Sequence, residues 1–158
     1  MPINRFFYWL CIMLVILEIL YGIYWAVPNI GIRLGLWPAD WNTGLAALIE
    51  TLSFWQEAAF FSHIVLNGIA LQALLNRSVA CIPAFGVAFI LDRMDWIILG
   101  LNPNSLNLAE SSLDKFIYAF GGIGLMAMLQ MMSIALMASL LFNGQLSTHL
   151  QFWRHPVQ

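Results

Sequence analysis

Residues 6–27 read FFYWLCIMLVILEILYGIYWAV, an apolar run that contains a single charged residue, Glu18. A helix of about 20 apolar residues is long enough to cross the hydrocarbon core of a bilayer. This run therefore predicts a first membrane-spanning helix. Because Glu18 interrupts the apolar region and no convincing small-residue cleavage site follows it, we expect a retained helix rather than a cleaved signal peptide.

The composition of the whole chain agrees with that class. Its 158 residues are 61% hydrophobic and 9% charged, with a mean hydropathy of +0.82. Soluble domains are about 45–50% apolar and about 25% charged. We therefore expect one multi-pass membrane domain covering residues 1–158, in a bacterial inner membrane or an equivalent bilayer. The six basic residues are scattered, which argues against a nucleic-acid partner.

Four apolar stretches are long enough to cross a bilayer, so we expect an all-α integral membrane protein with four transmembrane helices in an antiparallel bundle. Pro28 is expected to end the first helix. The second stretch is longer than a bilayer requires, so it must tilt or begin with an interfacial turn before Phe54. The short Asn76-Arg77 turn predicts that the second and third helices are antiparallel neighbours. The predicted spans are residues 6–27, 43–75, 78–101 and 116–142, and an interfacial tail is predicted over residues 144–158.

The distribution of charge between the loops predicts the orientation. With four spans, the N-terminus, the second loop and the C-terminal tail share one side of the membrane, which holds three arginines and no acids. The other side holds Arg33 and Lys115 together with three acids. Because positively charged loops stay in the cytoplasm, we expect both termini there. The three arginines are Arg5, Arg77 and Arg154.

Polar side chains inside the predicted spans fall at similar depths. With a rise of about 1.5 Å per residue, Glu18, His63, Asp92 and Gln130 lie about 18–20 Å from the cytoplasmic end of their spans. Three more charged residues follow at about 21–27 Å, whereas Glu50, at about 37 Å, is expected at the interface. We therefore predict one intramembrane polar cluster comprising Glu18, Glu57, His63, Asp92, Arg93, Asp95 and Gln130.

The predicted cluster contains four carboxylates and only one guanidinium. Helical geometry makes Asp92 and Asp95 neighbours and turns Arg93 away from Asp95, so Glu18 or Glu57 is its expected partner. An unpaired carboxylate in a dry interior is so unfavourable that it binds a proton instead. The excess acids must then be protonated, hydrated, bound to a cation or paired with bases of another chain. The alternative is that the third helix ends at Leu91 and these charges lie in a surface loop.

His63 could ligate a metal or haem, but a single histidine on an apolar helix is more often a structural, hydrogen-bonded residue. The sequence has no Glu-x-x-His pair of the kind that binds di-iron centres. Neither cysteine has metal or redox spacing. We therefore predict no metal site and no cofactor-binding residues, and the sequence leaves any cofactor unidentified.

Three functions fit an acid excess inside a small bundle. The leading expectation is a non-catalytic subunit or assembly factor of a larger membrane complex, with other membrane subunits or further copies of itself as partners besides the lipid bilayer. The second is a small proton- or cation-coupled transporter or channel, since intramembrane acids commonly relay ions. The third is an intramembrane enzyme acting on a lipidic substrate. No nucleophile–base triad or metal-hydrolase motif is present, so the sequence argues against an enzyme and identifies no catalytic residue.

Overall fold

A computed structural model describes residues 2–37, 43–100 and 124–148, and these form an all-α protein with five helices. Among the described residues, two helices, Arg5–Arg33 and Phe54–Leu75, are long and apolar enough to cross a membrane. Residues 102–115, which connect the third and fourth predicted spans, the first part of the fourth predicted span (residues 116–123) and most of the predicted tail lie outside the described residues. The helices are α1 (Pro2–Arg33), α2 (Thr43–Thr51), α3 (Phe54–Leu75), α4 (Cys81–Gly100) and α6 (Gly124–Phe142).

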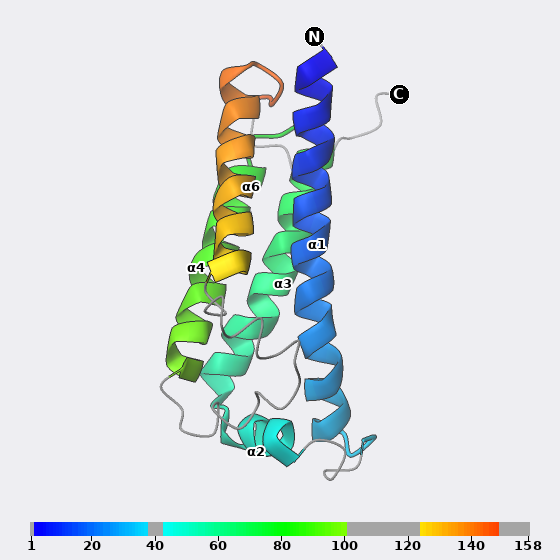
Figure 1. The fold of residues 1–158 in the computed structure, drawn as a ribbon, viewed down its shortest axis with the longest axis vertical. Helices are drawn as coiled ribbons and strands as arrows, with labels where there is room; N and C mark the ends of the chain where they lie inside the picture. The colour runs from blue at the N-terminus through cyan, green and yellow to red at the C-terminus, as the bar shows by residue number, and fades with distance from the viewer. Residues whose placement is uncertain (1, 38–42, 101–123, 149–158) are drawn as a thin grey trace.

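Four of these helices run side by side along the long axis of the molecule (Figure 1). Contacts between α1 and α3, α3 and α4, α4 and α6, and α6 and α1 close them into a ring. Neighbours in the ring run in opposite directions. The start of α1, the α3–α4 turn and the end of α6 therefore meet at one end, called here the upper end. The short helix α2 lies across the opposite, lower end (Figure 1).

The first helix is longer than the sequence predicted. The expected end at Pro28 is wrong, because α1 continues through this residue to Arg33. Proline removes one amide donor from the helical ladder. Neighbouring helices and local backbone adjustments can compensate for that loss in an apolar bundle. The helix is followed by Gly35, whose φ of +64° is the left-handed conformation that glycine adopts readily.

The long second stretch is two helices, so the tilted single helix is wrong and a break before Phe54 is correct. Ser53 caps α3: the amide of Gln56 donates to Ser53 Oγ at 3.4 Å. In return, the amide of Ser53 donates to Gln56 Oε1 at 2.9 Å. This capping box satisfies two amides that a helix start leaves unpaired. The local sequence thus fixes where α3 begins.

The short turn between α3 and α4 makes them antiparallel neighbours, as predicted (Figure 1). Arg77 has a left-handed φ of 54°, and its guanidinium lies over the Tyr8 ring of α1 at 5.0 Å. The chain after α6 returns to this turn. The amide of Ser147 donates to the Arg77 carbonyl at 2.6 Å, and the amide of Val79 donates to the Ser147 carbonyl at 2.9 Å. The first residues of the predicted tail therefore join the helices at the upper end.

The hydrophobic core occupies the upper half of the bundle, where these helix ends meet. Cys11, Val15, Leu74 and Met137 are completely inaccessible to solvent. The outer faces of the helices are also apolar, with large exposed side chains such as Met13 of α1. The core consists of Tyr8, Cys11, Ile12, Val15, Ala70, Ala73, Leu74, Ala80, Cys81, Phe85, Met137, Leu140 and Leu146.

Candidate functional site: a polar cluster inside the bundle

Three helices meet at the side chain of Gln130. Its Nε2 donates to Glu18 Oε2 of α1 at 2.9 Å and to Asp92 Oδ2 of α4 at 2.8 Å. Gln130, Glu18 and Asp92 are only 2%, 4% and 6% exposed, respectively. An amide group has two N–H donors, so one side chain can serve two carboxylates. The structure therefore brings together Glu18, Asp92 and Gln130 within the bundle.

Arg93 donates from Nη2 to the neighbouring Asp92, which also accepts from Gln130. The expected pairing of Arg93 with Glu18 or Glu57 is wrong. The arginine side chain is long enough to reach back to the adjacent residue. The position of Arg93 on the helix therefore does not determine where its guanidinium lies. Among the described residues, Arg93 Nε and Nη1 have no hydrogen-bond partner. The positive charge of Arg93 thus pairs directly with Asp92, which is one of the two carboxylates bound by Gln130.

The fourth helix of the ring, α3, contributes His63 and Asn67, which are 4% and 2% exposed. A Cβ atom added to Gly22 of α1 would lie 3.4 Å from His63 Nε2, so the imidazole packs against the α1 backbone there. Gly22 is one helical turn below Glu18. The imidazole therefore lies about one helical turn below the level of Glu18, on the side of α3 that packs against α1.

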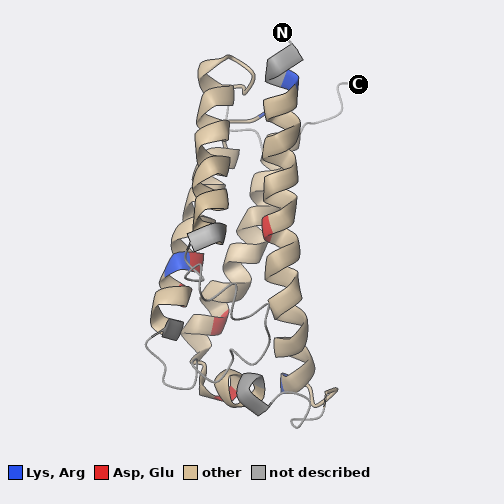
Figure 2. Cartoon of the chain, viewed as in Figure 1, with Lys and Arg blue, Asp and Glu red and all other residues tan. Residues whose placement is uncertain are grey.

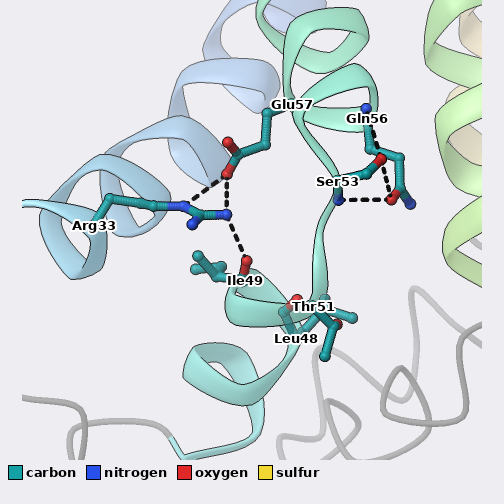
Figure 3. A network of polar contacts seen from close by, with 7 residues as sticks. All are labelled: Arg33, Leu48, Ile49, Thr51, Ser53, Gln56 and Glu57. Atoms are coloured by element: carbon teal, nitrogen blue, oxygen red, sulfur yellow. Dashed lines mark hydrogen bonds and ion pairs between the residues drawn. The ribbon is translucent and has the colours of Figure 1, made fainter.

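Glu57 lies apart from the cluster, at the lower end. Arg33 Nε donates to Glu57 Oε1 at 2.8 Å, and Arg33 Nη2 donates to the carbonyl of Ile49 at 2.7 Å (Figure 3). Glu57 was predicted in the cluster, but it pairs with Arg33 instead, because α1 continues past Pro28 and brings Arg33 to the start of α3. Because the chain breaks before α3, Glu50 and Glu57 lie on different helices. Glu50 is exposed on α2.

The charges of α4 lie within a continuous helix. The alternative of a third helix ending at Leu91 is wrong, because α4 runs to Gly100. Asp95 is half-buried one turn below Asp92, and its Oδ1 is buried with no hydrogen-bond partner among the described residues. In the described part of the chain, acidic residues lie in the middle and lower parts of the bundle rather than in its upper part (Figure 2).

The sequence prediction did not include a line of polar groups on α1. Tyr21, Trp25 and Asn29 follow Glu18 at intervals of three or four residues, which is one helical face. Asn29 is 7% exposed. Tyr21 Oη and Trp25 Nε1 are buried without a hydrogen-bond partner in residues 2–37, 43–100 and 124–148. Their spacing from Glu18 is the sequence signal that could have identified them.

Oxygen acceptors without donors distinguish this cluster from a closed hydrogen-bond network. Glu18 Oε1, Asn67 Oδ1 and Gln130 Oε1 are buried and have no hydrogen-bond donor among the described residues. They come from α1, α3 and α6. Within the same residues, no group of three or more His, Cys, Asp or Glu side chains could hold a metal ion. The cluster therefore offers acceptor oxygens to a species that brings positive charge or a hydrogen-bond donor.

Comparison of the chain with protein-family models, with curated proteins and with solved structures found no match.

Proposed function

We propose that this chain is a small membrane protein in which α1, α3, α4 and α6 all cross the bilayer. At about 1.5 Å per residue, α4 and α6 are about 30 and 28 Å long, close to the thickness of the hydrocarbon core. The four helices bury polar side chains and expose apolar ones, which is the arrangement that lipid favours. The exposed apolar residues include Trp9, Met13, Leu20 and Tyr24 of α1, Val65 and Ile69 of α3, Val87, Ile90 and Met94 of α4, and Met128 and Met131 of α6.

Within that fold, the proposed function is the transport of a proton or a small cation across the membrane. The observation that carries this proposal is the set of unpaired acceptor oxygens that Glu18, Asn67 and Gln130 present among the described residues. A buried carboxylate without sufficient donors is unfavourable by several kcal/mol, on the order of an unpaired buried charge. Binding a proton or cation removes that penalty, and releasing it restores the empty site. Intramembrane acids with this property commonly relay ions.

The role of a non-catalytic subunit or assembly factor is the second candidate. Pairing of the excess acids with bases of partner helices gives it little support, because Glu18 and Asp92 point into the bundle and are almost inaccessible. A different observation favours it. An apolar groove of about 820 Å³ runs between α3 and α4, and Gly68 and Ala84 line it. Small residues allow another helix to approach closely.

Flux measurements on the purified protein test the transport proposal. The protein is reconstituted in vesicles that contain a pH-sensitive dye, and a proton, Na⁺ or K⁺ gradient is imposed. We expect protein-dependent flux that falls at least tenfold in Glu18→Gln and in Asp92→Asn. Glu50→Gln, which changes an exposed acid on α2, should keep the wild-type rate. No flux under any of the three gradients, or equal flux in all variants, contradicts the proposal.

Native mass spectrometry of the protein, extracted in mild detergent, tests the second candidate. A stoichiometric second chain that is lost when Gly68 is replaced by Leu supports a subunit role. A functional protein free of other chains contradicts it. The hypothesis of an enzyme acting on a lipid stays a prediction.

A further inference from the structure

The two halves of the bundle interior differ in chemistry. Above Glu18, the space between the helices is filled by apolar side chains such as Val15, Leu74 and Met137, each with no accessible surface. In this half, the buried hydroxyl of Tyr8 donates to the backbone carbonyl of Leu74 at 3.3 Å. Such a tightly packed apolar layer excludes water and ions.

At and below the level of Glu18, the interior contains buried polar side chains as well as apolar ones such as Ala26. The inner face of α1 carries Tyr21, Trp25 and Asn29 toward the lower end, and the last of these lies about 16 Å below Glu18 at a rise of about 1.5 Å per residue. His63 of α3 lies beside this line, against Gly22. In the described part of the chain, the buried polar atoms without hydrogen-bond partners all belong to this level or to the half below it.

The lower end carries a connection among three helices, centred on Arg33. Its guanidinium binds the carboxylate of Glu57 on α3 and the carbonyl of Ile49 on α2 (Figure 3). The buried side chains of Leu48 and Ile49 turn one face of α2 toward the bundle. Arg33 therefore holds α2 across the end toward which the polar side chains lead.

We propose that, in the described conformation, the interior site exchanges its ion through the lower end only, along Tyr21, Trp25 and Asn29, and that Arg33 restrains α2 over this entrance. The inference rests on the proposed transport function and adds a direction and a controlling residue to it. The apolar upper half separates the site from the other side. The described conformation is then that of a carrier facing one side, in contrast to a continuous pore.

Cysteine labelling tests the direction of access. In a Cys11→Ser, Cys81→Ser background, a single cysteine is introduced by Asn29→Cys or by Val15→Cys, and a small water-soluble thiosulfonate is added to the reconstituted protein from both sides. Both positions lie on the inner face of α1 and are buried. We expect labelling at position 29 to be at least tenfold faster than at position 15. Equal rates, or a faster reaction at position 15, would overturn the inference.

The restraint by Arg33 is tested on the same Asn29→Cys protein. Arg33→Gln loses the bonds to both Glu57 and Ile49, so the labelling rate should rise several-fold. Arg33→Lys keeps a charge for Glu57 but lacks the planar fork, so an intermediate rate is expected. Glu57→Gln retains the bond to Ile49 and serves if Arg33→Gln fails to fold. Arg77→Gln, at the upper end, is the matched control and should leave the rate unchanged.

An unchanged labelling rate in folded Arg33→Gln and Glu57→Gln proteins contradicts the restraint. These outcomes are distinguishable from failure of the transport proposal, because labelling requires no flux. If Glu18→Gln abolishes flux while positions 15 and 29 label equally, transport stands and one-sided access fails. If labelling is asymmetric but no gradient drives flux, the transport proposal fails.

Discussion

The amide of Gln130 holds the carboxylates of Glu18 and Asp92 at 2.9 and 2.8 Å, and it does so where little water can replace it. At the scale of single residues, this contact joins α6 to both α1 and α4 through buried polar groups. Removing one partner from a buried charged network leaves the others without compensation, which is worse than removing all partners together.

Gln130→Leu should therefore destabilise the folded protein by about 3 kcal/mol, the order of magnitude for a buried charge that loses its partner. Unfolding in mixed detergent micelles, followed by circular dichroism, measures the change. Gln72→Leu replaces a half-buried amide in the outer groove and should change stability by less than about 1 kcal/mol. The double variant Gln130→Leu, Glu18→Leu should lose less than the sum of the single changes. Strict additivity would show that the amide and the carboxylate are not coupled.

Gly22 provides a second prediction at the same scale. A Cβ atom there would lie 2.7 Å from Ile64 Cγ1 and 3.4 Å from His63 Nε2, so α1 and α3 would have to separate or Ile64 would have to move. Gly22→Ala should destabilise the protein by about 1–3 kcal/mol through overpacking. Gly68→Ala is the matched control, because nothing lies within 4 Å of its added Cβ. The control should be neutral or stabilising by up to about 1 kcal/mol. Equal melting temperatures of the two variants would contradict the close packing at Gly22.

At the scale of secondary-structure elements, the start of α3 depends on Ser53. Ser53→Ala removes the hydroxyl that accepts from the Gln56 amide and should reduce stability by about 1 kcal/mol. Ser62→Ala also removes a hydroxyl, from an exposed position within α3, and should change stability by less than about 0.5 kcal/mol. Thermal unfolding of both variants measures the difference. A loss of the same size in both would argue against a capping role.

The element boundaries show what the sequence could and could not predict. Apolar length located the long helices, and the α3–α4 turn followed from Asn76 and Arg77, because these are local properties. The sequence does not predict the continuation of α1 through Pro28, because proline by itself indicates a helix end and the helices that compensate for its missing amide are distant in the chain. An end at Pro28 places Arg33 in a loop and hides its contact with Glu57.

The sequence predicts at which level of the bundle the site residues lie, but not toward which neighbours their side chains point. Distance along a helix is proportional to residue number, so the spacing of Glu18, Asp92 and Gln130 within their apolar stretches is enough to assign them to one level. Which side chains touch depends on helix rotation and on side-chain conformations. Arg93 illustrates this, since it binds the adjacent Asp92 in place of an acid on another helix.

At the scale of the whole molecule, the arrangement of the ends makes the predicted orientation testable. The start of α1 and the α3–α4 turn lie together at the upper end, and Leu36 lies beyond the other end of α1. If the four proposed spans and the loop charges are correct, the upper end is cytoplasmic. Topology reporters placed at the N-terminus and after Arg77 should both report the cytoplasm, and one placed after Leu36 should report the opposite side. A cytoplasmic signal from all three positions would contradict the four-span arrangement.

The bond between Gln130 and Glu18 also has a consequence in time. The two residues are 112 positions apart in the chain, and the ribosome adds about 5–20 residues per second. Glu18 is therefore synthesised roughly 6–22 s before the amide that completes its environment. Throughout that interval α1 carries a carboxyl group without its final donor. If α1 enters a bilayer as proposed, the Glu18 carboxyl must bind a proton or stay hydrated until α6 is synthesised.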